Sequence, residues 1–257
     1  MQPIPLPGPI AALVRGLRWE RDTVGRSFAG VYRLSDGKNT YYLKCGDEAD
    51  GLAGECRNLR WLRGRLPVPE VLAWAAEGGM EYMLLSEAGG RMLCDASYLR
   101  RPELAVSALA SGLRMLRAVD ISGCPLKNGL DEKLEAAAEN IRCGRLDPDD
   151  WAQMSDRYNS PWDLLCELRR TRPPEEPVFT HGDYCLPNVF AEGAEVTAML
   201  DLGGAGVADV WQDVALCIRS MRYNFGTDAH TPPLLRQIGL AMDPFKCRYY
   251  QLLDELF

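Results

Sequence analysis

The sequence lacks several features that define whole classes of protein. Its 257 residues contain no apolar run close to the roughly 18 residues that a membrane span requires. No positively charged segment precedes the short apolar stretch near the N-terminus, so we expect no signal peptide. Basic residues do not predominate, because Lys and Arg number 29 against 36 Asp and Glu, a net charge of −7. We therefore expect neither a membrane nor a nucleic acid as partner.

Closely spaced cysteines and abundant histidines are also missing. The nine cysteines are an odd number, and no two of them lie within four residues of each other. This pattern disfavours a zinc knuckle and a complete disulfide framework. A reducing cytoplasm is the expected location, with most cysteines acting as small core residues. There are two histidines in the whole chain.

The first third of the chain predicts a small α+β lobe, residues 1–88. The segments GVYRL and TYYLK read as strands, and Asp36-Gly37 between them is typical of a hairpin turn. Residues 51–64 carry leucines between charged residues and predict a helix. The segment PVPEVLAWAAEGGMEYMLLSEAGG predicts two more strands joined by a Gly-Gly turn.

Beyond a glycine-containing hinge at residues 86–92, the pattern predicts a larger, mainly helical lobe, residues 89–257. The expected elements are helices at 102–119, 131–143 and 161–170, helices starting at 208 and 234, and short strands around 178–190 and 196–202. The last helix should begin with Asp243 as N-cap and Pro244 at its first position. Its expected buried stripe consists of Phe245, Tyr249, Leu252 and Leu256.

Polar residues that could take part in catalysis or metal binding follow two apolar segments of the second lobe. THGDYCLPN holds Asp183 and Asn188 five residues apart, and Asp201 ends the apolar run in AMLDLGG. Carboxylate and carboxamide oxygens are the hard ligands that Mg²⁺ prefers. If Asn188 and Asp201 hold the ion, Asp183 can accept a proton from a hydroxyl, which is the division of roles in phosphoryl transfer. His181 is expected to brace this loop, and Asp213 to cap a helix or brace a loop.

The first lobe offers a candidate phosphate site. Lys44 lies in the apolar strand YYLKC, and Glu55 near the start of the next helix could hold its ammonium group. The loop GRSFAG, between the first two strands, contains Ser27 and two glycines that could present backbone N–H groups to phosphate. Taken alone, Lys44 is better explained as a solvated strand lysine.

These segments resemble the protein-kinase-like fold and, within it, the aminoglycoside 3′-phosphotransferases, the kanamycin and neomycin kinases. The resemblance runs along nearly the whole chain, through YYLKCG, ECRNLRWLRGRLPVPEVL, LLSEAGG, VFTHGDYCLPNVF and LDLGGAGVADVWQDVAL. The HGD-x4-N element with a following D-x-G also occurs in choline, fructosamine and homoserine kinases. The segments VDISGCP and LLDELF narrow the resemblance to the 3′-phosphotransferases.

The resemblance implies a bilobal kinase-like enzyme that uses ATP and Mg²⁺. Asp183 matches the catalytic base, and Asn188 and Asp201 match the Mg²⁺ ligands. Lys44 matches the lysine that binds the α- and β-phosphates, and Glu55 its salt-bridge partner. Further nucleotide contacts implied by the resemblance are Ser27 near the β-phosphate, Tyr42 stacking on adenine, and the hinge from Ser86 to Ala88.

The resemblance also implies a polycationic substrate and a ring of carboxylates to bind it. Asp254, Glu255 and the Phe257 carboxylate match the C-terminal contribution, and Asp150 and Asp156 lie in the segment that matches a second acidic patch. The implied reaction transfers the γ-phosphate of ATP to the 3′-hydroxyl of an aminoglycoside and confers resistance. A monomer or weak dimer is expected.

The sequence departs from the family at three positions. Gly204 stands where the family usually has the arginine of D-x-G-R, Tyr223 stands at an expected acidic contact, and Gln153 replaces an acidic-patch carboxylate. These losses concern substrate recognition more than phosphoryl transfer. Two alternatives therefore stay open: a kinase for another small cationic hydroxylated metabolite, such as an amino sugar or a choline-like amine, and a nucleotide-binding pseudokinase. The intact set of Lys44 and Asp183 with their partners argues against the pseudokinase.

Overall fold

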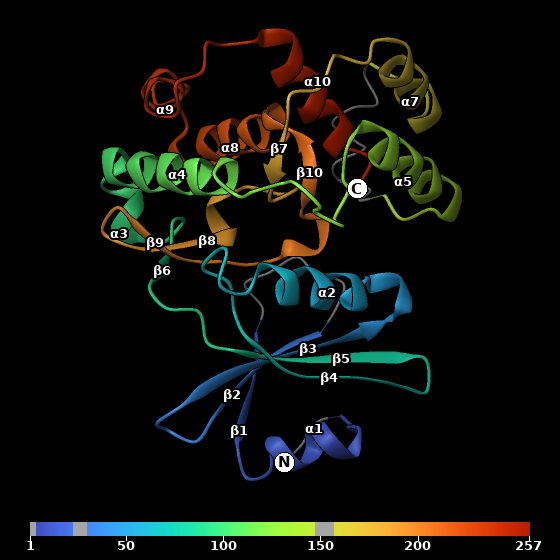
Figure 1. Ribbon diagram of the computed structural model, residues 1–257, viewed down its shortest axis with the longest axis vertical. Coiled ribbons are helices and arrows are strands. Elements are labelled where there is room, and N and C mark those ends of the chain that lie inside the picture. The colour runs from blue at the N-terminus through green and yellow to red at the C-terminus, as the bar shows by residue number, and fades with distance from the viewer. Residues whose placement is uncertain (1–3, 23–29, 147–156) are drawn as a thin grey trace. The chain divides into compact units, whose positions relative to one another are not determined.

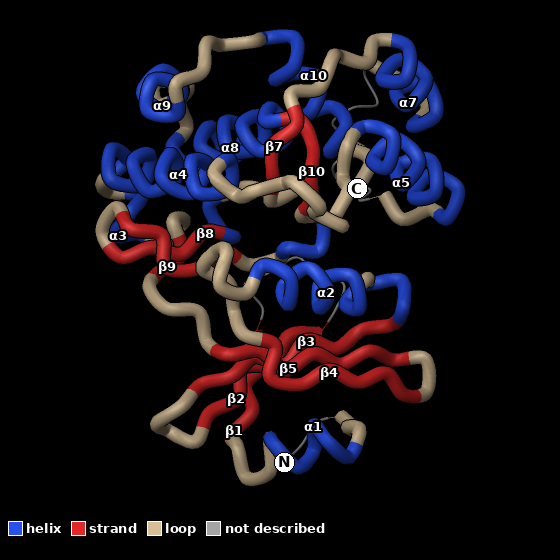
Figure 2. The backbone as a smooth tube through the Cα atoms, in the orientation of Figure 1, coloured by secondary structure: helices blue, strands red, loops and turns tan. Residues whose placement is uncertain are grey.

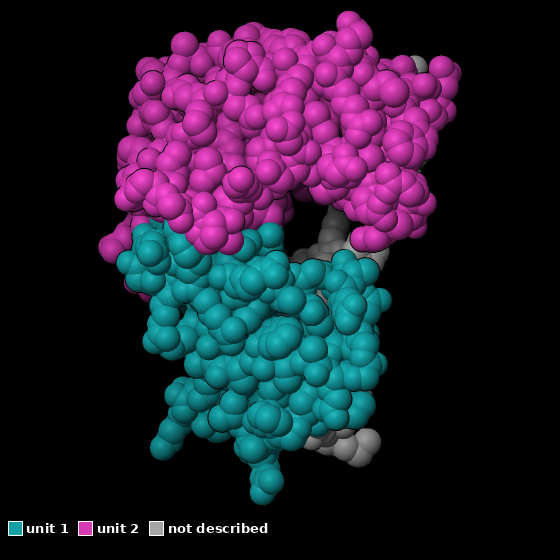
Figure 3. Space-filling view, turned by 45° about the vertical axis from the view of Figure 1, so that its right-hand side comes forward, with its two compact units in different colours: residues 1–90, 197–203 teal, residues 91–196, 204–257 magenta. Residues whose placement is uncertain are grey.

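The chain forms two compact units. The computed structural model describes residues 4–22, 30–146 and 157–257 (Figure 1). The first unit comprises residues 1–90 and 197–203, and the second comprises residues 91–196 and 204–257 (Figure 3). Asp201 therefore belongs to the first unit, although it follows the second unit's strands in the sequence. Strands dominate the first unit and helices the second (Figure 2), so the predicted α+β class is confirmed.

An antiparallel sheet forms the body of the first unit. Within the described residues it has five strands in the order β1-β2-β3-β5-β4. These strands are β1 (Arg18–Asp22), β2 (Gly30–Ser35), β3 (Thr40–Asp47), β4 (Val71–Glu77) and β5 (Met80–Ser86). The hairpin of β2 and β3 and the strand pair of β4 and β5 confirm the sequence prediction. The pattern does not predict the short helix α1 (Gly8–Leu13), which precedes the sheet.

The turn between β2 and β3 fixes the register of the central strand. Asp36 Oδ1 accepts the N–H groups of Lys38 and Asn39 at 2.8 and 2.7 Å, and Gly37 adopts φ +88°. A glycine tolerates this left-handed conformation without the penalty of a Cβ atom. The resulting register places Lys44 opposite Val31 on β2 and Met83 on β5.

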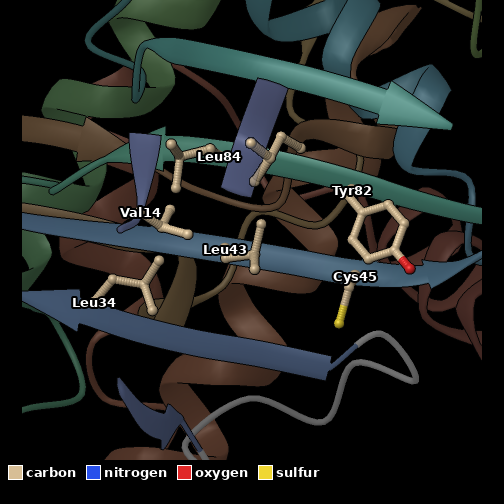
Figure 4. Close-up of a cluster of buried hydrophobic side chains, with 7 residues drawn as sticks. Val14, Leu34, Leu43, Cys45, Tyr82 and Leu84 are labelled. Atoms are coloured by element: carbon tan, nitrogen blue, oxygen red, sulfur yellow. The ribbon is translucent and has the colours of Figure 1, made fainter. Parts of the chain in front are cut away.

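One face of this sheet packs into an apolar core. Leu34, Leu43 and Leu84 come from three neighbouring strands and are at most 3% exposed (Figure 4). Val14, which follows α1, and Cys45 complete the contact with them. Because side chains alternate along a strand, Leu43 and Cys45 face this core and the side chain between them faces the other side of the sheet.

Helix α2 (Leu52–Leu62), predicted at residues 51–64, follows the central hairpin. Gly51 at its N-cap has no side chain to bond the first N–H groups. Glu81 on β5 supplies that acceptor, because its Oε2 takes the Ala53 N–H at 2.9 Å while the residue is 6% exposed. A carboxylate at a helix N-terminus is favoured by the helix dipole as well as by the hydrogen bond.

The second unit is mainly helical. Its described helices are α3 (Ala96–Leu99), α4 (Pro102–Arg117), α5 (Leu130–Cys143), α7 (Pro161–Arg170), α8 (Val210–Phe225), α9 (Thr231–Ile238) and α10 (Pro244–Asp254). Its strands are β6 (Arg91–Met92), β7 (Pro177–Thr180), β8 (Val189–Glu192) and β10 (Gly206–Asp209), and β9 (Glu195–Met199) runs from this unit into the first. The helices predicted in these regions are confirmed. No helix in the described ranges has the length and apolarity needed to cross a membrane.

The segment around residues 178–190 differs from its prediction as one short strand. It contains the end of β7, a loop, and the start of β8. Gly182 in this loop has φ +94°, and the 3₁₀ turn Leu186–Asn188 contains a proline, so neither position can continue a strand ladder. The interruption exposes Asp183 on a loop.

The terminal helix α10 has the predicted start but a different buried face. Asp243 caps it, accepting the Lys246 N–H at 2.9 Å. The predicted stripe is wrong at Phe245, which is 54% exposed, whereas Tyr250 is 2% exposed. The buried side consists of Cys247, Tyr249, Tyr250 and Leu253. Apolar character cannot distinguish Phe245 from Tyr250, so the elements that pack against α10 decide which ring is buried.

Candidate active site

The first unit holds a buried ion pair between its sheet and its helix. Lys44 Nζ on β3 lies 2.8 and 3.0 Å from the two carboxylate oxygens of Glu55 on α2. The two side chains are 12% and 8% exposed. The pair forms because Lys44 points to the side of the sheet opposite the apolar core, where α2 packs. A buried pair with both oxygens engaged fixes the ammonium group in one position.

Asp201 forms a second ion pair with the same ammonium group. Its carboxylate is half exposed, at 50%. Asp201 is also the one non-glycine among the described residues with a positive φ, at 56°. Strained backbone of this kind persists only where surrounding contacts enforce it, and it occurs most often at functional sites.

Asn58 supplies part of that enforcement. Its Nδ2 on α2 donates to the carbonyls of Leu202 and Gly203 at 2.8 and 3.0 Å. Asn58 lies three residues after Glu55, so both side chains project from the same face of α2. One helix therefore positions both the partner of Lys44 and the turn that follows Asp201.

Two carboxylates stabilise the charged form of Lys44, whereas burial raises the pKa of Glu55 and the like charge of Asp201 adds to that rise. Burial alone lowers the pKa of Lys44, but the carboxylates of Glu55 and Asp201 outweigh it and hold that pKa well above its usual range. Lys44 is therefore a permanent cation at any physiological pH. Its carboxylate partners leave it positively charged and correctly placed to bind an anionic group such as a phosphate.

The second unit carries the loop that follows β7. Asp213 on α8 is 2% exposed, and its two oxygens accept the N–H groups of His181 and Gly182 at 2.7 and 2.9 Å. Ser220, seven residues further along the same helix, accepts the Leu186 N–H at 3.0 Å. Burial raises the pKa of Asp213, and these N–H donors and His181 oppose that rise. The prediction that Asp213 braces a loop thus corresponds to two backbone hydrogen bonds.

Gly182 is required by close packing as well as by its conformation. A Cβ atom on Gly182 would overlap the carbonyl oxygen of Gly204. Asn128 donates from Nδ2 to the same carbonyl. The loop after β7 and the turn before β10 therefore touch backbone to backbone, which places the residue after Gly182 at the surface.

That residue, Asp183, is exposed and is held by its own loop. Asn188 Nδ2 donates to Asp183 Oδ2 at 2.8 Å and to the Asp183 carbonyl at 3.1 Å. The Asp183 N–H donates to Nδ1 of the fully buried His181 at 3.3 Å, so His181 braces the loop as expected. The arrangement presents a fixed, ionisable carboxylate on a rigid loop, as a general base requires.

Two of the C-terminal carboxylates predicted to bind substrate, those of Asp254 and Glu255, share one cation. Arg219 on α8 forms ion pairs with Asp254 and with Glu255, the latter at 3.0 Å between Nη1 and Oε1. Lys133 Nζ on α5 lies 4.4 Å from the centroid of the Phe257 ring. The sequence pattern does not indicate either cation, because each partner pair is separated by dozens of residues in the chain.

The remaining predicted residues fall into two groups. Tyr42 is partly buried on β3, and Ser86 ends β5 with its N–H bonded to the Glu70 carbonyl at 3.0 Å. Ala88 lies in the loop that follows. Three predicted residues lie outside the described ones: Ser27, Asp150 and Asp156.

Space at Gly204 does not explain the missing arginine. A Cβ atom there would meet its neighbours at 3.7 Å or more, which is ordinary van der Waals contact. A side chain could therefore begin at this position without displacing the backbone of Gly182 or the amide of Asn128. Packing around the Cβ position of residue 204 therefore does not exclude an arginine.

Known proteins match this chain along almost its entire length. A profile of the phosphotransferase enzyme family matches residues 18–242. An aminoglycoside 3′-phosphotransferase from Niallia circulans is 38% identical over 240 residues, which cover 91% of this chain and 90% of the relative.

Two solved structures share the fold. The crystal structure of an aminoglycoside 3′-phosphotransferase of type VIII superposes with a TM-score of 0.86, 32% identity, and 97% coverage of each chain. The aminoglycoside phosphotransferase APH(3″)-Id from Streptomyces rimosus in complex with ADP and streptomycin has a TM-score of 0.80 at 27% identity, covering 96% of this chain and 95% of that one. The predicted kinase-like fold is confirmed. The chain belongs to the phosphotransferase enzyme family that includes the aminoglycoside 3′-phosphotransferases.

Proposed function

We propose that this enzyme transfers the γ-phosphate of ATP to the 3′-hydroxyl of a cationic aminoglycoside and thereby confers resistance to it. The observation that carries the proposal is the exposed Asp183 carboxylate, held by Asn188 on a loop that α8 braces at three N–H groups. The nucleotide would bind to residues 1–88 and the aminoglycoside to residues 89–257.

Lys44 is the proposed phosphate ligand. Its ammonium group is fixed by Glu55 and Asp201 and remains charged. Adenine would stack on Tyr42 and bond to the hinge from Ser86 to Ala88. Because the Ser86 N–H is already bonded to Glu70, the hinge donor is expected to be the Ala88 N–H. Ser27 in the glycine-containing loop would contact the β-phosphate.

Asn188 and Asp201 have the donor chemistry for Mg²⁺. The Asn188 amide nitrogen is bonded twice to Asp183, which leaves its carbonyl oxygen as the group suited to a hard cation. Asp201 contributes a half-exposed carboxylate. Mg²⁺ in kinase sites is held by one or two such oxygens together with substrate phosphates. When bound, the ion would neutralise charge on the transferred phosphoryl group.

Asp183 would orient the acceptor hydroxyl and take its proton late in a loose transition state. Its hydrogen bond from Asn188 restricts the carboxylate to one orientation. Positioning of this kind, more than basicity, is what phosphoryl transfer demands of the residue. The wild-type reaction should therefore depend strongly on the geometry of this loop.

The substrate's ammonium groups would bind the C-terminal carboxylates of Asp254, Glu255 and Phe257, together with Asp150 and Asp156. Arg219 holds the carboxylates of Asp254 and Glu255 in place and partly neutralises them.

All nine cysteines are free thiols, in keeping with action in the reducing cytoplasm. The enzyme would act as a monomer or weak dimer.

A coupled ADP-release assay with Mg·ATP tests the proposal. Kanamycin should be turned over and tobramycin, which lacks the 3′-hydroxyl, should not. Asp183→Ala should lose nearly all turnover yet keep nucleotide binding, because Asp183 lies outside the Lys44 cluster. Substantial residual turnover in that variant would show that another residue is the base.

The same assay should include streptomycin as a second candidate acceptor. The Streptomyces rimosus structure that shares this fold contains streptomycin. Turnover of streptomycin without kanamycin would assign the enzyme to a 3″-hydroxyl instead. Turnover of neither, with ATP binding intact, would point to an amino sugar or a choline-like amine.

A further inference from the structure

Helix α5 buries a lysine beside the C-terminal residue. Lys133 is 9% exposed, and lysine is seldom this buried unless its charge is compensated. Its Nζ lies 4.4 Å from the centre of the Phe257 ring. Burial lowers the pKa of Lys133, and the carboxylates of Asp254, Asp183 and Asp213 oppose that effect. The ammonium group is thus within electrostatic range of Asp183 on the catalytic loop, Asp213 on α8 and Asp254 near the chain's end.

The same face of α5 holds a second contact to the C-terminus. Asn140 Nδ2 donates to the Leu256 carbonyl at 3.0 Å. Positions 133, 137 and 140 share one face of a helix, and Ala137 between them is fully buried. The small alanine lets the chain's end approach α5, and the C-terminus lies beside this helix in Figure 1.

These contacts account for the last four residues one by one. Arg219 binds Asp254 and Glu255, Asn140 binds the main chain of Leu256, and Lys133 faces the ring of Phe257. Ordinarily the end of a chain is poorly ordered unless such contacts restrain it. Here the restrained segment, residues 254–257, carries the carboxylates proposed to bind the substrate.

We propose that Lys133 is a positioning residue that, with Asn140, holds residues 254–257 in the geometry that recognises a cationic substrate. The role rests on the proposed function. Lys133 would act through the Phe257 ring and the neighbouring carboxylates, and need not touch the substrate. Its loss should therefore weaken substrate binding and leave nucleotide binding unchanged, because the proposed adenine and phosphate contacts lie in the first unit.

Lys133→Met is the sharpest test, because methionine keeps much of the side-chain length and removes the charge. The fold should survive it, since Asp254 retains Arg219 and Asp213 retains two backbone N–H donors. The KM for kanamycin should rise by about tenfold, which corresponds to about 1.4 kcal/mol and lies within the range known for cation–π contacts. The KM for ATP should stay unchanged, and kcat should change much less than the kanamycin KM.

Two companion variants separate this role from a general structural one. Lys133→Arg keeps a cation that can lie over the Phe257 ring and should restore most of the kanamycin affinity. Arg142→Met removes an exposed cation from the same helix, where Arg142 pairs with Glu139, and should leave both KM values alone. Equal changes in both KM values for Lys133→Met, or no change in either, would overturn the proposal.

Carboxypeptidase A provides a readout that needs no substrate, since it releases a C-terminal phenylalanine only from an accessible chain end. Phe257 should be released slowly from the wild type and about tenfold faster from Lys133→Met and Asn140→Ala. If wild type fails to phosphorylate kanamycin, the proposed function is wrong, and this assay still decides whether α5 anchors the C-terminus. Unchanged release rates in both variants would refute the anchoring.

Discussion

Asp213→Asn tests how the catalytic loop is held. The carboxylate accepts two backbone N–H groups on two different oxygens, at 2.7 Å from His181 and 2.9 Å from Gly182, and Asp213 is 2% exposed. Asparagine has nearly the same shape but one acceptor oxygen. One N–H must therefore face an NH₂ group, and the other loses a charged acceptor.

The magnitude follows from these two bonds. A hydrogen bond to a charged group contributes about 1.5–3 kcal/mol, and a buried N–H left without an acceptor costs about 1–3 kcal/mol. We expect the second unit to lose roughly 3–5 kcal/mol of stability, which lowers Tm by about 6–20 °C for a chain of this size. Because Asp183 directly follows the loosened N–H groups, kcat should also fall, by about tenfold or more.

Thermal unfolding and ADP release at a low, common temperature measure the two effects separately. Asp228→Asn is the matched control, since Asp228 makes an exposed ion pair with Arg222 at 2.6 Å, and exposed pairs contribute about 0–1 kcal/mol. If Asp213→Asn unfolds at the wild-type temperature and keeps its kcat, the two backbone hydrogen bonds do not brace the loop, and the reasoning fails.

Three further predictions follow from the described contacts. Gly182→Ala should abolish turnover, because its Cβ would overlap the Gly204 carbonyl at a left-handed φ; wild-type kcat would contradict this. Glu81→Gln should weaken the cap of α2, lowering stability by about 1 kcal/mol and raising the KM for ATP but not for kanamycin. Burial raises the pKa of Tyr249 to about 12, so the stability it contributes is present below pH 10 and lost as pH rises to 12. Tyr249→Phe should remove about 1–2 kcal/mol of that alkaline loss of stability, after allowance for screening, and should also lose the hydrogen bond to the Leu168 carbonyl at neutral pH. Denaturant midpoints measured between pH 7 and 12 would test both effects. If the wild type and the variant lose stability equally between pH 10 and 12, the assignment to Tyr249 is wrong.

Local sequence patterns predict helices and hairpins well where a single local interaction, such as a turn, determines the element. Asp36-Gly37 indicates the hairpin that sets the register of Lys44, and the turn contains the expected bonds. The sequence pattern indicates α4, α5 and α7 with ends within two residues. The phase of α10 could not be predicted in the same way, because Phe245 and Tyr250 have comparable apolar character and the surrounding elements select which is buried.

Sequence motifs also indicated Lys44 with Glu55, and Asp183 with Asn188, since each of these pairs lies on neighbouring elements. The amino-acid sequence by itself predicts the α+β arrangement of elements, the hairpin, and the residue types needed for phosphoryl transfer. Folding added the partners that come from far away in the chain: Asn58 for the turn after Asp201, and Lys133 and Arg219 for the C-terminus. Hydrogen bonds and ion pairs between distant segments leave no periodic trace in the sequence, because their distance in space is set by the packing of whole helices and sheets.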